Sequence, residues 1–289
     1  MRKFILDSDW WTDCDDAVAV RLLCNAHRQG EVELLGINLN ACMEYSIPSL
    51  DVFTRDCGVM IPLGVDHAAV EFEGIPAYQE HLAKTQEVQR YNQDVPDSLA
   101  FYRQLLTASE DDSVEVLSIG FTQVLSGLLA DAFTADLVRR KIKHLWIMAG
   151  KWDEIGGLEY NFSLNALARR SGADLCDHWP TPITFLGWET GHSVISGNDL
   201  PDNDLLKQVM ADHGSAAGRS SWDPMLALLA VIGDPSAAGY RCVYGQARVD
   251  AENGRNYFTE DISGTHRYVV KQREDLYYAG AINARLTVL

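Results

Sequence analysis

Short apolar runs alternate with longer segments of helical periodicity along most of the chain, and this alternation is the feature that most limits its fold. The apolar runs predict strands at 3–6, 32–39, 61–65, 114–119, 144–149 and 183–187. The periodic segments predict helices at 15–27, 46–57, 98–108, 122–132, 164–170 and 222–232. Strands that alternate with helices form mostly parallel sheets covered by helices on both faces. We therefore expect an α/β fold in which residues 1–289 form a single domain, because no linker, repeat or low-complexity tract divides the chain.

Three segments fit this alternation less well. The segment 74–96 is polar and rich in Gln and Glu, and we expect a lid or surface excursion there. The tail from Arg241 has a β-like pattern, and 277–285 is predicted to form a closing helix.

Polar residues and glycines collect where the predicted strands end. In open parallel sheets, ligands bind outside the carboxyl ends of the strands. The positions concerned are Asp7 and Asp9 after the first strand, Asn38 and Asn40 at the second, and Gly120 and Gly150 after later ones. We expect the functional site at this edge of the sheet.

The charge balance excludes two classes of partner. With 41 acidic residues against 24 Lys and Arg, the formal net charge is -17, which disfavours nucleic acids and anionic membranes. The longest apolar run, 225–233, is about half of what a membrane-spanning helix needs, and the first residues lack the pattern of a secretory signal. The six cysteines are scattered without a CxxC pair, which favours free thiols and a cytoplasmic location over a zinc site.

Five carboxylates lie within ten residues at the first predicted strand end: Asp7, Asp9, Asp13, Asp15 and Asp16. Such a cluster is sometimes only a solvated acidic loop. Here it stands between a buried strand and a buried helix, where water cannot solvate all five charges. A hard divalent cation with oxygen ligands resolves this conflict. The cluster therefore predicts a metal site, and the carboxylates alone suit magnesium or manganese as well as calcium.

A phosphatase interpretation starts from the same residues but fails two tests. Haloacid-dehalogenase-type phosphatases also place Asp-x-Asp after a first strand and use the first Asp as nucleophile. Their motif has Thr or Val two residues after the second Asp, where this chain has Trp11. They also have a later Gly-Asp with a further Asp four residues on, whereas Asp234 is followed by Ala238 at that position.

The segment 7–17, Asp-x-Asp-x-x-x-Asp-x-Asp-Asp-Ala, resembles the N-terminal signature of the inosine–uridine-type nucleoside hydrolase family. Later segments fit this resemblance in the right order. Residues 119–123 resemble the family's Gly-Pro-Leu-Thr-Asn loop, 148–150 and 158–161 its Gly-Gly and Glu-Phe-Asn segments, and 221–224 its Trp-Asp-Pro segment. The first and last of these motifs are the specific ones. The resemblance implies a Rossmann-related α/β fold and an enzyme that splits an N-glycosidic bond with water.

The resemblance also implies a calcium ion held by four residues. Asp9, Asp16 and Asp223 supply carboxylates, and in an ungapped alignment the main-chain carbonyl of Gln123 completes the protein ligands. Waters or ribose hydroxyls fill the remaining positions, within the six to eight oxygens that calcium accepts.

Roles for the other site residues follow from the same resemblance. Asp9 is expected to deprotonate the attacking water, and negative charge nearby to stabilise an oxocarbenium-like transition state. Asp15 and Asn161 are expected to bind the ribose hydroxyls, and Glu159 the 5′-hydroxyl end. Asp7 is expected to orient the loop or one of the metal ligands without contacting the metal itself. Asp13 is an additional acid found in one branch of the family, and we place it with Asp7.

The sequence departs from the family on both sides of the expected pocket. Trp11, next to Trp10, stands where many relatives have Gly early in the loop, and the two indoles either line the sugar pocket or pack the loop. Met43 replaces a ribose-binding Asn, for which Asn40 is the substitute.

The leaving-group side departs as well. Trp222 replaces the His that protonates the leaving base in the inosine–uridine subgroup. As in the purine-specific subgroup, this indole either stacks on the base or only caps the last helix. His192 is a remaining candidate acid near a strand end.

These observations leave two kinds of function. The first is a calcium-dependent hydrolase of ribonucleosides, with a preference for purines. The alternative is a family member that binds metal and a sugar but acts on another glycoside or with little catalysis. By analogy we expect a homo-oligomer, a dimer or tetramer.

Overall fold

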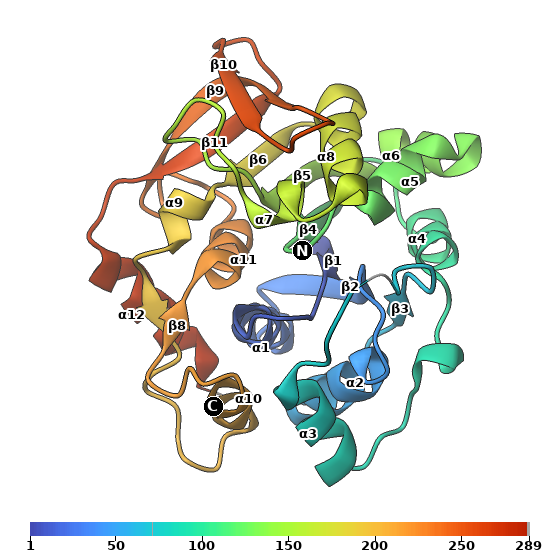
Figure 1. Ribbon diagram of the computed structural model, residues 1–289, viewed down its shortest axis with the longest axis vertical. Helices are drawn as coiled ribbons and strands as arrows, with labels where there is room; N and C mark the ends of the chain where they lie inside the picture. The colour runs from blue at the N-terminus through green and yellow to red at the C-terminus, as the bar shows by residue number, and fades with distance from the viewer. Residues whose placement is uncertain (71, 288–289) are drawn as a thin grey trace.

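A nine-stranded sheet runs through the molecule. The computed structural model describes residues 1–70 and 72–287. The strands lie in the order β10-β9-β11-β6-β5-β4-β1-β2-β3, and those from β11 to β3 are parallel to their neighbours (Figure 1). β9 runs antiparallel to both β10 and β11. The expected α/β fold with a mostly parallel sheet is confirmed. The strands are β1 (Arg2–Ser8), β2 (Val32–Leu39), β3 (Leu63–Val65), β4 (Val114–Ser118), β5 (Ile142–Met148), β6 (Ile183–Leu186), β9 (Tyr240–Val249), β10 (Asn256–Glu260) and β11 (His266–Lys271).

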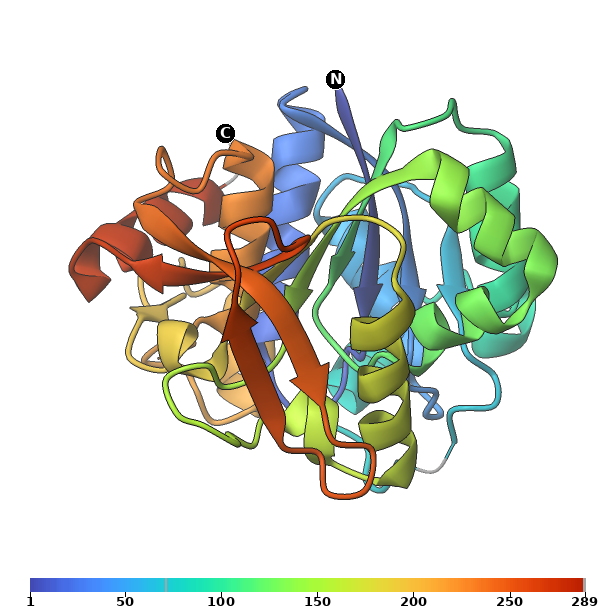
Figure 2. The ribbon, with the colours of Figure 1, turned by 90° about the horizontal axis from the view of Figure 1, so that it is seen from above.

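Helices cover both faces of the sheet, as Figure 2 shows from above. One face packs against α1 (Asp15–Arg28), α2 (Ser46–Asp56), α3 (Ala77–Thr85), α10 (Leu205–Asp212), α11 (Trp222–Ile232) and α12 (Asp275–Leu286). The other packs against α4 (Ser98–Thr107), α5 (Gln123–Ala130), α6 (Ala132–Lys141) and α8 (Ala166–His178). Short elements complete the chain: η1 (Asn92–Asp94), α7 (Tyr160–Ser163), α9 (Trp188–Gly191), and a small antiparallel sheet of β7 (Ile195–Ser196) and β8 (Arg219–Ser220).

Most residues of the segment 74–96 are exposed or half-buried, as a surface excursion requires, but part of the segment is helical. It contains α3, which packs against α2 and buries Tyr78, Gln79 and Leu82. The other residues of this helix are mostly polar and exposed, which hid a narrow apolar stripe from the sequence pattern. As a result α3 supports the loop after β1: the Tyr78 hydroxyl donates to the Trp11 carbonyl at 2.9 Å, and the Gln79 amide donates to the carbonyl of Trp10.

The predicted helix at 122–132 corresponds to α5, and a helix that was not predicted, α6, follows it directly. α5 ends before Asp131, whose side chain accepts from the Thr134 N–H at 2.9 Å and starts α6. This is an ordinary N-cap, which satisfies backbone donors that have no partner within the helix. α6 has only three buried residues, Thr134, Leu137 and Val138, so its apolar periodicity is weak.

α11 agrees with its prediction at both ends. Pro224 occupies its first turn, and Gly233 ends it with φ 79, a left-handed conformation that glycine adopts without strain. This helix is buried along nearly its whole length and carries Asp223 at its start, next to the carboxyl ends of the parallel strands. In the part of the chain that the structure describes, no helix combines the length and the apolar character of a membrane span.

Candidate active site

A cavity of about 330 Å³ lies at the carboxyl ends of the central strands, where the sequence placed the site. Residues from the β1–α1 loop, from the ends of β4 and β5, and from α7, α9 and α11 meet there. Its walls are formed by Asp9, Thr12, Asp13, Asp15, Asp16, Ile119, Met148, Glu159, Tyr160, Asn161, Trp188, Trp222 and Asp223. Its walls therefore combine carboxylates with aromatic rings, and we call the part formed by Trp188 and Trp222 its aromatic side.

The loop after β1 holds its aspartates through backbone N–H groups. Trp10 has φ 46, an unfavourable value for a residue with a side chain. This conformation lets the Trp10 N–H reach Asp16 Oδ1 at 3.2 Å, while the Trp11 N–H donates to Asp9 Oδ1 at 3.0 Å. The strain is sustained by packing, because the Trp10 indole is fully buried and donates to Ser49 Oγ at 2.9 Å.

Three of the carboxylates come within metal-ligand range of one another. Asp15, Asp16 and Asp223 each place one oxygen within 4.8 Å of the others, and all three side chains are buried. The backbone N–H of Asp223 donates to Asp15 Oδ2 at 3.1 Å, which joins the start of α11 to the start of α1. Asp9 faces the same cavity from the loop after β1.

The surrounding protein does little to compensate the negative charges of these carboxylates. Burial, together with the negative charge of Asp15, raises the pKa of Asp9 to about 7. Burial and neighbouring carboxylates also raise the pKa values of Asp15, Asp16 and Asp223 well above the ordinary range. A set of buried oxygens that repel one another fits a hard divalent cation, which would neutralise them together.

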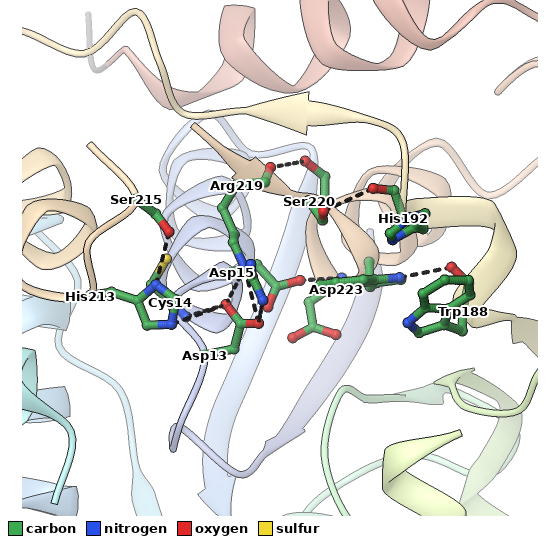
Figure 3. Close-up of polar contacts among 12 residues, drawn as sticks. Asp13, Cys14, Asp15, Trp188, His192, His213, Ser215, Arg219, Ser220 and Asp223 are labelled. Atoms are coloured by element: carbon green, nitrogen blue, oxygen red, sulfur yellow. Dashed lines mark hydrogen bonds and ion pairs between the residues drawn. The ribbon is translucent and has the colours of Figure 1, made fainter. Parts of the chain in front are cut away.

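Asp13 differs from this cluster because it has a cationic partner. Arg219 Nε lies 2.9 Å from Asp13 Oδ1, and Arg219 Nη2 lies 2.5 Å from Oδ2. Figure 3 shows this pair beside Asp15 and Asp223. The guanidinium also lies over the Trp222 ring, 5.4 Å from its centroid. Asp13 thus anchors β8 to the loop.

A second group of possible ligands, Asp13, Cys14 and His213, surrounds the same ion pair. Two of its members are unsuited to a metal in this arrangement. Asp13 is paired with Arg219, and burial together with the charge of Asp13 raises the pKa of the Cys14 thiol. His213 donates to or accepts from Ser215 Oγ at 2.9 Å (Figure 3). We interpret this group as a structural support of the loop.

Glu159 and Asn161 flank the cavity on the side of β5. Glu159 Oε2 accepts from the Gly150 N–H at 3.0 Å and Oε1 from the Asn161 N–H at 2.8 Å. Burial nevertheless raises the pKa of Glu159 to about 7. Asn161 Nδ2 donates to the Met148 carbonyl at 3.0 Å, which fixes the amide and leaves Oδ1 as its acceptor for a ligand.

Two indoles form the aromatic side of the cavity. Trp222 Nε1 donates to the carbonyl of Trp188 at 2.8 Å, and the two ring centroids are 6.4 Å apart. His192 stacks on Trp188 with ring centroids 4.2 Å apart and does not itself line the cavity. Trp188 was missed in the sequence, although its position directly after the predicted strand 183–187 was a usable signal. Thr12, Ile119, Met148 and Tyr160 were also not anticipated.

Asp7 and Asn40 lie behind the cavity and support it. Asp7 Oδ2 accepts from Asn38 Nδ2 and from the Tyr102 hydroxyl, each at 2.9 Å, and Asn40 donates to Asp7 Oδ1. Asn40 Oδ1 accepts from the Phe121 N–H at 3.1 Å. Both Asn40 amide atoms are therefore used within the protein.

Gln123, Trp10 and Trp11 also do not line this cavity. The Gln123 amide donates to the Asn40 carbonyl and lies 3.4 Å from Asp66 Oδ2. Trp10 is in the core, and Trp11 packs against Phe72 and Phe121 with ring centroids 4.9 and 6.3 Å away. Both indoles thus pack the loop.

Comparison with known proteins gives a clear result for the fold. No protein-family model matches the sequence, and no curated protein matches it either. Among solved structures, an inosine-guanosine nucleoside hydrolase superposes with a TM-score of 0.71 at 14% identity, with 99% of each chain covered. An inosine-uridine preferring nucleoside hydrolase from Bacillus anthracis gives a TM-score of 0.70 at 15% identity, again with 99% of each chain covered.

A third similar structure has a different description. The type III effector protein XopQ, complexed with adenosine diphosphate ribose, gives a TM-score of 0.66 at 14% identity, covering 99% of this chain and 93% of that one. At such low identity these likenesses concern the backbone. The chain has the fold of the nucleoside hydrolases over its full described length.

Proposed function

We propose that this protein is a metal-dependent nucleoside hydrolase that splits the N-glycosidic bond of a ribonucleoside with water. One observation carries the proposal: Asp9, Asp15, Asp16 and Asp223 share a cavity in which no counter-charge of the described residues neutralises them. The fold of this chain and the motifs at 7–17 and 221–224 support the same conclusion.

The proposed cation is Ca²⁺: the oxygen ligands of the cluster suit a hard divalent cation, and the resemblance to the nucleoside hydrolases favours calcium among these cations. Asp9, Asp16 and Asp223 would hold it, together with one backbone carbonyl. The alignment assigns this carbonyl to Gln123, and Ile119, which lines the cavity, is a second candidate. When bound, such a cation would lower the pKa of a water molecule and hold ribose hydroxyls.

The chain's own groups then have definite tasks. Asp9 is the general base that takes a proton from the attacking water. Asp15 and the Oδ1 of Asn161 accept hydrogen bonds from the ribose hydroxyls. Glu159 binds the 5′-hydroxyl end of the ribose. The remaining carboxylate charge stabilises the positive charge that develops on the sugar in the transition state.

The aromatic side favours a purine as the leaving base. Trp222 and Trp188 offer flat faces beside the cavity, and a base that stacks on an aromatic ring gains about 1–3 kcal/mol. A purine has the larger face and gains more from such stacking. The proposed substrate is therefore a purine ribonucleoside.

An alternative function is favoured by the composition of the walls. Among the described residues that line the cavity there is no histidine to protonate a leaving base. The protein would then bind metal and a sugar with little catalysis, or act on another glycoside. The effector XopQ, which shares this fold and was solved with adenosine diphosphate ribose, indicates one ligand to include in a screen.

The deciding experiment measures ribose release from a panel of purine and pyrimidine nucleosides, with and without a calcium chelator. The proposal expects release that stops on chelation, resumes with Ca²⁺, and is lost in Asp9→Asn. Asp174→Asn, at a half-buried position on α8 outside the cavity walls, is the matched control and is expected to behave as wild type in ribose release. Tight Ca²⁺ binding without release from any nucleoside would move the assignment to the alternative, which binding of adenosine diphosphate ribose would support.

Two further expectations belong to this proposal. We propose a homo-oligomer, a dimer or tetramer, which light scattering coupled to size-exclusion chromatography measures. We also propose a cytoplasmic location, consistent with six cysteines that form no disulfide.

A further inference from the structure

A second and larger cavity, of about 660 Å³, lies away from the acidic cluster. Its lining residues come from the turn that follows α11, from β9 and β11, and from the segment after β11. Figure 1 shows where these elements lie in the fold. α11 has 11 residues, so about 16 Å separates Asp223 at its start from this turn. This cavity is therefore independent of the proposed active site.

Three arginines line this cavity, Arg241, Arg267 and Arg273, against one carboxylate, Asp234. Asp234 Oδ1 accepts from the Ser236 N–H at 2.8 Å and from the Ala237 N–H at 3.3 Å, so it stabilises its own turn. This concentration of positive charge is unusual in a chain with a net charge of -17.

These three arginines differ from several others in the molecule, which form ion pairs with carboxylates. Arg21 pairs with Asp56 and Arg285 with Glu31, for example. Within residues 1–70 and 72–287, no ion pair is formed by Arg241, Arg267 or Arg273. Three guanidinium groups that share a cavity with a single carboxylate repel one another, and a bound anion reduces that repulsion.

Arg267 is held in place before any ligand binds. Its Nε donates to Thr184 Oγ1 at 2.7 Å, and its guanidinium lies 5.9 and 6.0 Å from the ring centroids of Trp146 and Tyr244. These contacts use one of five N–H donors and fix the plane of the group. The terminal N–H groups stay available for a planar, bidentate contact.

Gly239 lets a second arginine come close. Its φ is 89, and a Cβ at this position would lie 3.0 Å from Arg273 Cγ. Glycine thus permits the turn and the approach of the Arg273 side chain to the same cavity.

We propose that this cavity is a binding site for a phosphate-bearing anion, either inorganic or the phosphate group of a small molecule. Phosphate oxygens match the fork of donors on a guanidinium, and three such groups in one cavity suit a doubly charged ligand. The proposal does not depend on nucleoside hydrolysis, because none of its residues lines the acidic cavity.

The test is isothermal titration of metal-free protein with inorganic pyrophosphate and, separately, with ribose 5-phosphate at low ionic strength. We expect one saturable site per chain, and the tighter probe identifies the source of the phosphate. Arg273→Gln and Arg267→Gln are each expected to weaken binding by about tenfold or more. Arg248→Gln removes the same charge from β9 outside the cavity and is expected to change binding less than about twofold.

The variants also distinguish an anion site in this cavity from a general effect of positive charge on the surface. Asp9→Asn is expected to leave anion binding unchanged, which keeps the result distinct from the hydrolase assay. Arg273 is exposed, so Arg273→Gln decides the matter if Arg267→Gln does not fold. The proposal is overturned if neither probe binds saturably, or if Arg248→Gln weakens binding as much as Arg273→Gln does.

Discussion

Asp7 and Asp9 are two residues apart, both are buried, and their surroundings are opposite. Asp7 accepts hydrogen bonds from Asn38, Asn40 and the Tyr102 hydroxyl, all of them neutral donors. Asp9 accepts from one backbone N–H and otherwise faces other carboxylates. Burial raises the pKa of Asp7 to about 6 and that of Asp9 to about 7.

The difference shows what each group is for. A buried carboxylate surrounded by donors is satisfied within the protein and serves the structure. Buried carboxylates that face one another are satisfied only by something the chain does not supply. Substitution of Asp9 should therefore mainly reduce activity, and substitution of Asp7 should mainly reduce stability.

The largest effect is expected from Asp9→Asn. The amide cannot accept a proton from water, so kcat should fall by about 10²–10⁴-fold while the fold is kept. Ribose release and the circular dichroism spectrum are the measurements. A decrease of less than about tenfold would mean that another residue is the base.

Asp7→Asn should give the reverse result. The new amide brings a donor toward Asn38, Asn40 and Tyr102, which already donate to this position. We expect a loss of about 1–3 kcal/mol in unfolding free energy and a change in calcium affinity below about tenfold. Urea unfolding and calcium titration measure the two. If Asp7→Asn abolishes calcium binding and leaves the unfolding free energy unchanged, the contrast between Asp7 and Asp9 is wrong.

The stability of the metal-free protein should depend on pH through the acidic cluster. The pKa of Asp9 is raised to about 7 in the folded chain, so folding favours the protonated form. Stability from this group is present at low pH and is lost as pH rises toward about 7.

Unfolding free energy should therefore fall more between about pH 5 and pH 8 in wild type than in Asp223→Asn, which has one cluster charge fewer. Saturating calcium should remove most of this difference, because the cation takes over the neutralisation. Equal pH dependence of the two metal-free proteins would show that the carboxylates are already compensated.

The smallest effect is expected on the aromatic side of the same cavity. Trp188→Ala removes one flat face, so kcat/KM for purine nucleosides should fall by about tenfold, with a smaller change for pyrimidine nucleosides. Trp188→Phe is the matched variant, and it should recover part of the loss. A uniform decrease for all bases would instead indicate that the Trp188 ring only packs beside the Trp222 ring, whose centroid lies 6.4 Å away.

Much of the fold and of the acidic cluster could be predicted from the sequence. The strand ends at Asp7 and Asp9 are local signals, and parallel strands bring their carboxyl ends to one edge wherever they lie in the chain. Asp223 was reached through the Trp-Asp-Pro start of a helix whose limits, 222–232, the structure reproduces. Glu159 and Asn161 were found in the same way, through a short segment after β5.

The directions of individual side chains could not be predicted. Asn40 follows a strand at the correct edge, yet its amide is used by Asp7 and Phe121. Gln123 was expected to supply only its main-chain carbonyl, and its side chain turns toward Asn40 and Asp66. Such choices depend on neighbours from other elements, which a pattern along one chain does not contain. The proposed ligand set and the single-domain organisation are still predictions.

The strained turn at Trp10 also bears on how the site is assembled. The aspartates of the loop are contiguous in sequence, but the turn that orients them is held by Ser49 of α2 and by Tyr78 and Gln79 of α3. A chain that has formed β1 and α1 alone would possess the acidic residues without their arrangement. Calcium affinity should therefore appear late during refolding, after α2 and α3 have docked. The time at which calcium binding appears would then report when these two helices have packed against the loop after β1.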